Sequence, residues 1–239
     1  MSSTQNLARE AASREAGSRH VFLADFQFAG RGRSGRDWVA PAESALLFTV
    51  LLLERGLKLH EHTMCVSVSV CETLEHMMPL KPLIKWPNDV LIDDRKVCGV
   101  LAESTDASPG YVAVGLGLNI AWGGVRPPGV PEWATALDEH SQARMHRGRL
   151  LEDVIRSLDA WLSTTSSAVF HDQLRSAWES RLWRRGELVT VKLDGRVVQG
   201  HLRGTDADGA LIISMDDGQQ ASILNGELIL PGRPSRSDR

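Results

Sequence analysis

The sequence predicts an α+β protein in which helices flank a mixed β-sheet and a small β-barrel follows at the C-terminus. Two observations support this prediction. Strand-like segments separated by short turns dominate residues 83–119 with few crossover helices, which indicates a mixed or antiparallel sheet and not a doubly wound one. From Gly186 onward, hairpin-type dipeptides such as Asp194-Gly195 and Asn225-Gly226 separate short strand-like segments, which is typical of a closed or half-closed barrel.

The elements of the first region follow from hydrophobic periodicity. A helix is expected over residues 4–16, because Leu7, Ala8 and Ala11 share one face and Gly17 follows as a stop signal. Residues 63–78 fit both the alternation of a strand and the 3.6-residue period of a helix, but their length favours a helix. Residues 148–183 are expected to be helical with a break near 164–167. The expected strands are Val21–Phe26, Ala45–Leu53, Leu83–Lys85, Val90–Ile92, Lys96–Glu103 and Tyr111–Asn119.

Residues 184–231 form the second predicted domain, after a first domain of residues 1–183. The expected strands of this barrel are Glu187–Leu193, Arg196–Arg203, Ala210–Met215, Gln219–Leu224 and Glu227–Leu230. The tail over residues 232–239 has no apolar side chains to bury apart from one proline, and it is predicted to be disordered.

Composition and charge exclude several classes of protein. A formal net charge of −3 argues against a protein that coats nucleic acid non-specifically. No apolar run approaches the roughly 18–20 residues of a membrane helix. The N-terminus lacks the basic start and apolar core of a signal peptide, so a cytoplasmic protein is expected.

Cysteine and histidine usage predicts no metal site. The cysteines Cys65, Cys71 and Cys98 are odd in number and lack CxxC spacing, which excludes a disulfide scaffold and a four-cysteine zinc site. His60 and His62 flank Glu61, but no third ligand is evident. This short segment is interpreted as a solvated connection.

The segment Gly30–Trp38 (GRGRSGRDW) is the densest candidate for a binding site. It carries three arginines in a slightly acidic protein, and its glycines let the backbone approach a ligand closely. A dinucleotide-binding loop is disfavoured, because Trp38, a proline and a buried strand follow in place of a helix. Guanidinium groups on such a loop can hold carboxylate or phosphate oxygens. The alternative is a solvated surface loop with incidental charge.

Three further signals lie downstream. The segment KWPND predicts a turn that presents Trp86, Asn88 and Asp89, although Trp86 could instead belong to the core. Lys96 opens the next strand, where a lone lysine is usually solvated. The glycines of Gly115–Asn119 leave one strand face bare, either for a ligand or for a tight sheet contact. Together these residues suit a phosphate-bearing or carboxylate ligand without naming it.

The motifs GRGRSGRDW, KWPNDVLIDDRKVCGVLAE and GLGLNI, in this order and spacing, resemble those of the bacterial biotin protein ligases. The resemblance covers Ser3 to about Asn119, and the C-terminal strand pattern is similar to the SH3-like barrel of that family. It implies a core like that of the biotin and lipoate ligases and the class II aminoacyl-tRNA synthetases. The chain begins at the Ser-Thr pair that the resemblance places on the ligand. It therefore matches the form without an N-terminal DNA-binding domain, and no repressor role is expected.

The resemblance also implies a reaction and its participants. The enzyme would join biotin to ATP with the help of Mg²⁺, forming biotinyl-5′-AMP. It would then transfer biotin to a lysine of the biotin carboxyl carrier domain of a carboxylase. Neither DNA nor a membrane is an expected partner, and the sequence leaves a monomer and a homodimer open.

The resemblance assigns roles to individual residues. Lys96, Arg31 and Arg33 would be catalytic: Arg31 and Arg33, with Gly32, would surround the biotin carboxylate and the α-phosphate, and Lys96 would contact both. Trp38 would pack against adenosine. Ser3, Thr4, Gln5 and Gln27 would bind the ureido ring, and Gln5 stands where the family usually has Asn. Asn88, Asp89 and Asn119 would lie on the nucleotide side. Gly30, Gly99 and Gly117 would lie around the ligand.

Three other functions stay open on the sequence alone. A lipoate or octanoate ligase shares the core and the acyl-adenylate chemistry. A nucleic-acid-binding module could use the arginine loop and the barrel, but one Tyr, five Phe and a negative net charge do not suit a stacking surface. A catalytically inactive, partner-binding protein of the same fold is the third alternative.

Overall fold

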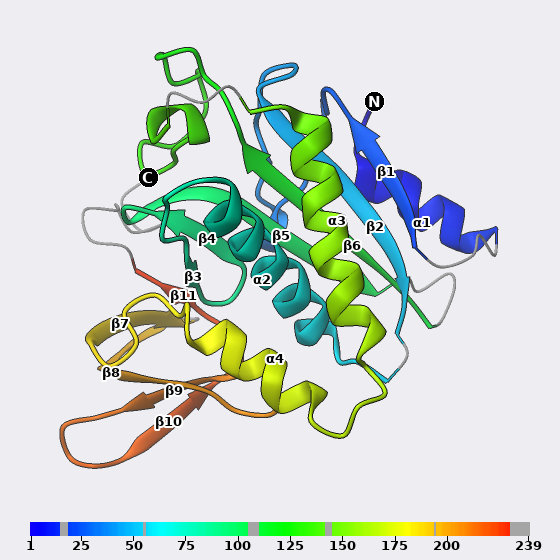
Figure 1. Ribbon diagram of the computed structural model, residues 1–239. Helices are drawn as coiled ribbons and strands as arrows, with labels where there is room; N and C mark the ends of the chain where they lie inside the picture. Colours follow the sequence, from blue (N-terminus) through cyan, green and yellow to red (C-terminus); the bar gives the residue numbers. More distant parts are fainter. Residues whose placement is uncertain (15–18, 55, 105–109, 142–144, 194, 230–239) are drawn as a thin grey trace.

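The computed structural model describes residues 1–14, 19–54, 56–104, 110–141, 145–193 and 195–229, and it contains two antiparallel sheets (Figure 1). The larger sheet has the strand order β1-β2-β6-β5-β4-β3. Every pair of these strands is antiparallel, and parallel pairing within the described ranges is confined to isolated bridges, Ile84 with Leu182 and Lys96 with Ala134. The strands are β1 (His20–Ala24), β2 (Ala45–Leu53), β3 (Leu83–Lys85), β4 (Asp89–Ile92), β5 (Arg95–Ser104) and β6 (Tyr111–Asn119).

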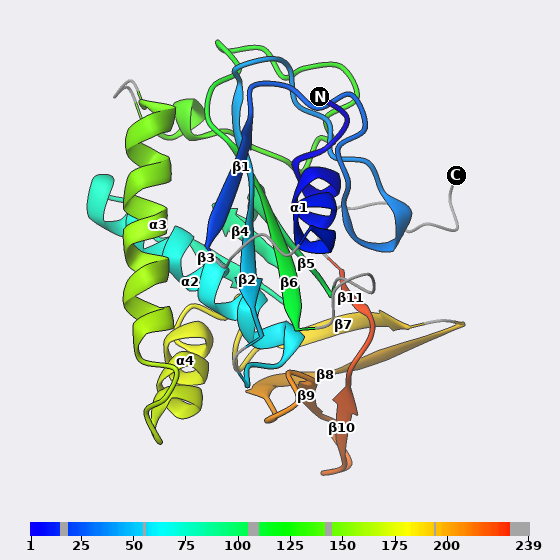
Figure 2. The same ribbon diagram turned by 90° about the vertical axis from the view of Figure 1, so that its right-hand side faces the viewer.

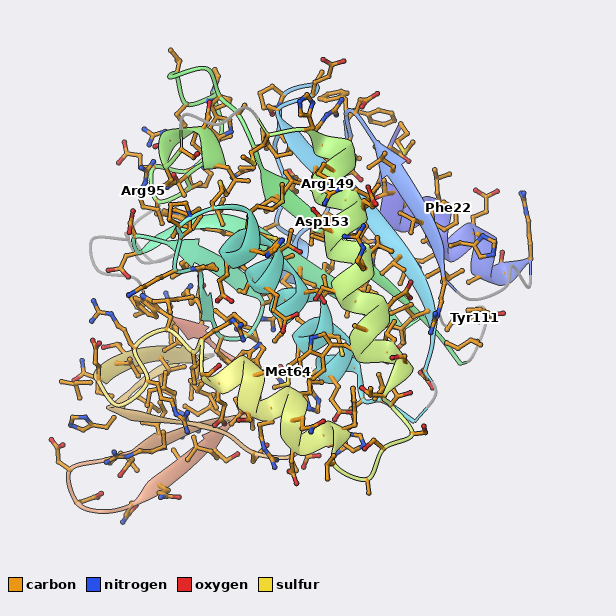
Figure 3. All side chains as sticks on the ribbon, viewed as in Figure 1. Phe22, Met64, Arg95, Tyr111, Arg149 and Asp153 are labelled. Carbon is orange, nitrogen blue, oxygen red and sulfur yellow. The ribbon has the colours of Figure 1, made fainter. Side chains whose placement is uncertain are left out.

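Helices cover both faces of the larger sheet (Figure 2). Helix α1 (Thr4–Ser13) lies on one face, and α2 (Leu59–Met77) and α3 (Arg147–Ser163) lie on the other. The exposed side of α3 carries ion pairs such as Arg149 Nε to Asp153 Oδ2 at 2.8 Å (Figure 3). Helix α4 (Phe170–Glu179) packs against α2 and the second sheet. Because α3 ends at Ser163 and α4 begins at Phe170, the predicted break in the helical region is confirmed. No helix within the described ranges is long and apolar enough to cross a membrane.

Strand β2 is almost entirely apolar because both of its faces are covered. Phe48 belongs to the main core with α2 and α3, whereas Ala45 and Leu47 pack with Trp38 on the opposite face. Side chains alternate along a strand, so Thr49 shares the face of Leu47. Its fully buried hydroxyl is the polar exception in this strand, and it lies on the side of the sheet that carries α1.

The hairpin between β4 and β5 decides where Lys96 points. Asp93 and Asp94 both have positive φ, as a two-residue type I′ turn requires. The register shifts next to this turn, because Leu91 pairs with Lys96 while Val90 pairs with Cys98, and one extra residue is left in β5. Such a β-bulge reverses the alternation of side chains beyond it. Lys96 therefore lies on the same face as Gly99, three residues away, and not on the opposite one.

The second sheet has the order β10-β9-β8-β7-β11 and its own apolar interior, which continues into the main core through Trp178 and Trp183. Its strands are β7 (Leu188–Leu193), β8 (Arg196–Thr205), β9 (Leu211–Ser214), β10 (Gln220–Ile223) and β11 (Glu227–Leu228). These five strands confirm the predicted C-terminal β-structure. The predicted disordered tail lies outside the described residues.

Helix α2 begins four residues before the prediction, at Leu59, and this corrects the interpretation of the segment around Glu61. The Glu61 carboxylate accepts a hydrogen bond from the backbone N–H of Lys58 at 2.8 Å, which caps the helix. Glu61 and His62 are buried, so the prediction of a solvated connection was wrong. The reason is tertiary: α4 packs against α2, with His171 beside Glu61, and the loop between β8 and β9 contacts Lys58.

The buried His62 predicts a pH dependence of folding stability. Burial lowers the pKa of His62 below its ordinary value of 6.5, so the unfolded chain takes up the proton first as the pH falls. The His62 ring therefore stabilises the fold less below about pH 6.5 than above it. In urea unfolding between about pH 7.5 and 5.5, the advantage of the wild type over His62→Asn should shrink as the pH falls. A constant difference would contradict this.

Candidate active site

A cavity of about 390 Å³ opens on the α1 face of the larger sheet. It lies between the start of α1, the loop over residues 29–38, strands β4 to β6 and the segment 129–134. The expected site residues that line it are Ser3, Thr4, Gln5, Gln27, Arg31, Gly32, Arg33, Trp38, Asn88, Asp89, Lys96, Gly99, Gly117 and Asn119. Segments more than a hundred residues apart in the chain thus meet around one cavity.

Gly30 is the expected site residue that the structure leaves outside the cavity lining. It forms the neck of the loop, where its carbonyl accepts a hydrogen bond from the backbone N–H of Trp38 at 3.0 Å. A Cβ on Gly30 would lie 2.5 Å from the Trp38 carbonyl oxygen, so only glycine lets the two ends of the loop approach this closely. Gly30 shapes the loop that carries Arg31 and Arg33.

Several lining residues were not among the predicted site residues. Thr49 and Gly115 lie on the floor, and Trp133 belongs to the segment 129–134 on the wall. Two of them had a visible signal: Thr49 interrupts an apolar strand, and Gly115 belongs to the glycine pattern noted in β6. Trp133 had none, because its position depends on a bridge between Lys96 and Ala134 that only the fold creates.

Hydroxyl and amide groups form one end of the cavity. Gln27 Oε1 accepts hydrogen bonds from the Thr4 backbone N–H at 2.6 Å and from the Thr4 hydroxyl at 3.1 Å. Ser3 caps α1, and its Oγ accepts from the Gln5 backbone N–H at 3.2 Å. These bonds use acceptor oxygens. The Ser3 hydroxyl and the Gln27 amide nitrogen have no acceptor among the described residues and can donate to a ligand.

The Gln5 side chain forms part of the wall. It is almost fully buried, its Nε2 donates to the Ala113 carbonyl at 3.0 Å, and its Oε1 accepts from Thr49 Oγ1 at 3.1 Å. A Cβ on Gly115 would lie 2.6 Å from Gln5 Oε1. The two hydrogen bonds, to Ala113 and from Thr49, use most of the hydrogen-bonding capacity of the Gln5 amide.

Lys96 and Asp89 form an ion pair at the other end of the cavity. Their Nζ and Oδ1 atoms are 2.5 Å apart, and the two side chains are only 16% and 15% exposed. Burial acts to raise the pKa of Asp89, but the positive charges of Lys96 and Lys85 outweigh it and hold that pKa below the ordinary 3.8. Asp89 thus stays ionised and keeps the ammonium group of Lys96 in place.

The two expected catalytic arginines have different surroundings. Arg31 Nη2 pairs with Glu103 Oε1 at 2.9 Å near the surface. Arg33 donates only a long hydrogen bond, 3.4 Å, to Asn88 Oδ1, and the described residues place no carboxylate within ion-pair distance of it. Burial lowers the pKa of Arg33 and outweighs the opposing effect of the negative charge of Asp89. Arg33 is therefore well suited to bind an anion.

Aromatic rings cover the bare strand face and flank Lys96. A Cβ on Gly117 would lie 2.3 Å from Trp38 Cε2, and one on Gly99 would lie 3.1 Å from Trp38 Cζ3, so the indole rests directly on these strands. Lys96 Nζ lies 5.4 Å from the Trp38 ring centroid and 5.8 Å from that of Trp133, within cation–π range. The Trp38 Nε1 atom is buried without a partner among the described residues.

The KWPND turn divides between cavity and core. Asn88 and Asp89 line the cavity, and Asn88 Nδ2 donates to the Val100 carbonyl of β5 at 2.6 Å. Trp86 is 2% exposed and points away into the core, which was the alternative that the sequence left open. Asn119 lines the cavity, but its amide also donates to the Thr135 carbonyl at 3.0 Å and so holds the neighbouring segment.

Comparisons with known proteins agree with the cavity and with the second sheet. Residues 1–119 match the biotin/lipoate A/B protein ligase family, and residues 186–230 match the biotin protein ligase C-terminal domain. The biotin--[acetyl-CoA-carboxylase] ligase of Paracoccus denitrificans is 33% identical over 83% of this chain and 85% of its own length. The bifunctional ligase/repressor BirA of Escherichia coli is 29% identical over 87% of this chain and 65% of its own.

A solved structure agrees as well. The biotin protein ligase of Aquifex aeolicus in complex with biotin and ATP superimposes with a TM-score of 0.82 and 30% identity, over 95% of this chain and 94% of that one. These findings define an α+β ligase core with an appended C-terminal domain. The chain belongs to the biotin protein ligase family.

Removal of the Asp89 charge should destabilise the protein in a pH-dependent way. Asp89→Asn leaves the shielded Lys96 ammonium without its counter-charge, which should cost roughly 3 kcal/mol of unfolding free energy at neutral pH. Because the Asp89 pKa lies below 3.8 in the folded state, its stabilising contribution is present above that value and lost as the pH falls further. Denaturant unfolding across this range should show the two proteins converging in acid. A difference that does not depend on pH would contradict the argument.

Proposed function

We propose that this protein is an ATP-dependent biotin protein ligase. It would form biotinyl-5′-AMP and transfer the biotinyl group to a lysine of the biotin carboxyl carrier domain of a carboxylase. The observation that carries the proposal is one cavity with a neutral polar end at Ser3, Thr4 and Gln27 and a cationic end at Arg33 and Lys96. In this proposal residues 1–183 are the catalytic domain and 184–231 the C-terminal domain.

The polar end suits the ureido ring of biotin. A ureido group has one carbonyl acceptor and two N–H donors, and it needs hydroxyl and amide partners when it leaves water. The Ser3 hydroxyl and the Gln27 amide nitrogen supply donors. The hydroxyl oxygens of Ser3 and Thr4 each accept one hydrogen bond within the protein and keep a second lone pair that can accept from the ureido N–H groups. Lipoate and octanoate end in apolar groups that would leave these partners unpaired, which favours biotin over the ligands of the sister enzymes.

The cationic end suits the first chemical step. An oxygen of the biotin carboxylate attacks the α-phosphorus of ATP, the bond from that phosphorus to the bridging oxygen breaks, and pyrophosphate leaves. Both reactants are anionic, so fixed positive charge is required where they meet. Arg33 has no carboxylate within ion-pair distance among the described residues and would bind the α-phosphate, while Lys96, held by Asp89, would contact the carboxylate and the phosphate.

Trp38, Asn88, Asp89 and Asn119 would hold the nucleotide next to these cations. The indole of Trp38 would leave the glycine surface of β5 and β6 and pack on adenosine, and Arg31 with Gly32 would close the loop over the ligand. Closure would exclude water from the mixed anhydride, which hydrolyses readily. In the second step the carrier lysine attacks the acyl carbon, an amide forms, and AMP leaves.

Mg²⁺ would enter with the triphosphate and would neutralise charge on the phosphates. The described residues contain no group of three or more His, Cys, Asp or Glu side chains that could hold a metal ion. A Mg²⁺ ion that keeps phosphate and water ligands needs one or two protein carboxylates. Asp37, which lines the cavity, could supply one.

ATP–pyrophosphate exchange tests the proposed function directly. With Mg²⁺ present, exchange should require biotin and should not occur with lipoate or octanoate. Lys96→Ala should lower the exchange rate at least about a hundredfold, because a fixed charge at the transition state is lost. Exchange with lipoate or octanoate in place of biotin would reassign the protein to those ligases, and exchange with none of the acids would contradict the proposal.

The loop should also retain the intermediate. Arg33→Gly removes the guanidinium group proposed to bind the α-phosphate, so biotinyl-5′-AMP should leave before transfer. Biotin should then label lysines of a bystander protein such as serum albumin in addition to the carrier domain, as a streptavidin blot would show. Arg156→Gly on the exposed face of α3 is the control and should label only the carrier domain. The same result with Arg33→Gly would contradict the retention role.

A further inference from the structure

The second sheet contacts the turn that carries Asn88 and Asp89. The Trp86 indole is buried beside this turn, and its Nε1 donates a hydrogen bond to the Gly209 carbonyl at 3.0 Å. Gly209 belongs to the loop over residues 206–210, which joins β8 to β9. One end of this contact therefore lies in the C-terminal sheet, and the other lies two residues from the wall of the cavity.

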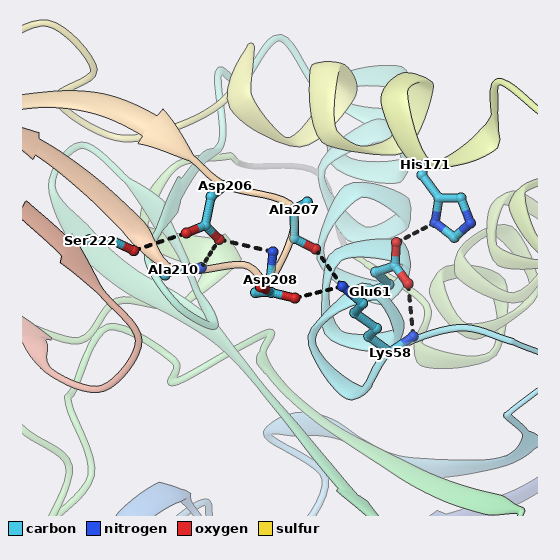
Figure 4. Close-up of polar contacts among 8 residues, drawn as sticks. All are labelled: Lys58, Glu61, His171, Asp206, Ala207, Asp208, Ala210 and Ser222. Carbon is cyan, nitrogen blue, oxygen red and sulfur yellow. Dashed lines mark hydrogen bonds and ion pairs between the residues drawn. The ribbon is translucent and has the colours of Figure 1, made fainter.

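The loop over residues 206–210 is held in one conformation by its own hydrogen bonds (Figure 4). Asp206 Oδ1 accepts from the backbone N–H groups of Asp208 at 2.9 Å and Ala210 at 3.0 Å. Asp206 Oδ2 accepts from the Ser222 hydroxyl of β10 at 2.9 Å. With its polar groups paired in this way, the loop presents the Gly209 carbonyl at a fixed position.

The same loop is fastened to the start of α2. Lys58 Nζ contacts Asp208 Oδ1 at 2.6 Å and the Ala207 carbonyl at 3.1 Å (Figure 4). Gly209 has a φ of +76°, and a Cβ there would lie 2.6 Å from the His60 ring. Only glycine allows the loop to approach α2 closely enough to reach Trp86.

On the other side of Trp86, the turn is joined to the charged end of the cavity. The Asn88 carbonyl accepts from the Val100 N–H at 2.9 Å, and Asn88 Oδ1 accepts from Arg33 at 3.4 Å. Asp89, the next residue, holds Lys96. A shift of the Trp86 indole would move this turn, and shifts of about 1 Å are enough to impair catalysis strongly.

We propose that Trp86 is a positioning residue through which the loop over residues 206–210 of the second sheet fixes Asn88 and Asp89 for the nucleotide. This inference rests on the proposed function and deepens it, because it assigns the second sheet a part in the adenylation step. Trp86 does not line the cavity, so it acts only through the turn. The effect of its loss should therefore fall on ATP and leave biotin binding at the distant polar end unchanged.

Trp86→Phe tests the proposal, because it keeps a buried aromatic ring and removes the N–H donor. In biotin-dependent ATP–pyrophosphate exchange, kcat/KM for ATP should fall about tenfold, as expected for one buried hydrogen bond. The KM for biotin should stay within about twofold of the wild type. Trp161→Phe is the matched control, since it removes an indole donor that bonds Glu72 at 3.3 Å on the opposite face of the sheet. It should leave both constants unchanged.

A second variant distinguishes positioning from a general loss of packing. Lys58→Met releases the loop from α2 without touching Trp86 or the cavity. Like Trp86→Phe, it should lower kcat/KM for ATP, here by raising the KM for ATP. Because both substitutions act through one loop, the double variant should be no worse than Trp86→Phe alone. The proposal would be overturned if the losses of kcat/KM for ATP in the two single variants added up in the double variant. It would also be overturned if kcat/KM fell equally for ATP and for biotin and the Tm fell as well.

The exchange activity of the wild type distinguishes a failure of this proposal from a failure of the proposed function. If the wild type supports biotin-dependent exchange and Trp86→Phe equals Trp161→Phe, only the positioning role fails. If the wild type supports no exchange with any acid, the proposed function fails, and the positioning role fails with it.

Discussion

The ion pair between Lys96 and Asp89 is the contact on which the geometry of the cavity depends. Two opposite charges 2.5 Å apart, each about 85% shielded from water, attract each other strongly, and neither can be removed without leaving the other unpaired. The pair exists because the β4–β5 turn and its bulge place Lys96 on the cavity face. The Trp38 and Trp133 rings lie within cation–π range of the ammonium group and line the cavity beside it.

Two parts of the chain hold this charged centre from opposite sides. The loop of Arg31 and Arg33 covers it from the α1 face, and glycine surfaces on β5 and β6 leave room for the Trp38 indole. The second sheet reaches the same centre from the other end of the KWPND turn, through Trp86. The cationic loop also contacts the second sheet directly, since Arg36 Nη1 lies 3.3 Å from Glu227 Oε1 of β11. Loop, turn and second sheet therefore form one connected arrangement.

Much of the fold and the site could be predicted because the decisive signals are local. Periodicity located all strands of the larger sheet, and the three motifs contain the charged residues of the cavity. Its neutral polar residues Ser3, Thr4, Gln5 and Gln27 lie outside the motifs and came from the family resemblance. The errors arose where distant segments meet. His62 was predicted in a solvated connection, yet it is buried at the start of α2, against which α4 and the loop over residues 206–210 pack. Trp133 carried no signal, because a bridge at Lys96 places it. Gly30 supports the loop without lining the cavity.

The sequence by itself determined the order of elements, the cationic loop, the glycine pattern of β6 and the family to which these motifs point. Residue type and spacing act over a few positions, so a reader of the sequence can apply them directly. The tertiary structure decided which cation is free. Arg31 is paired with Glu103, Lys96 with Asp89, and Arg33 with no carboxylate among the described residues. It also decided that Lys96 and Gly99 share a face, because a β-bulge depends on the partner strand. Ion pairs and register are properties of two chain segments together, and the sequence of either one does not contain them.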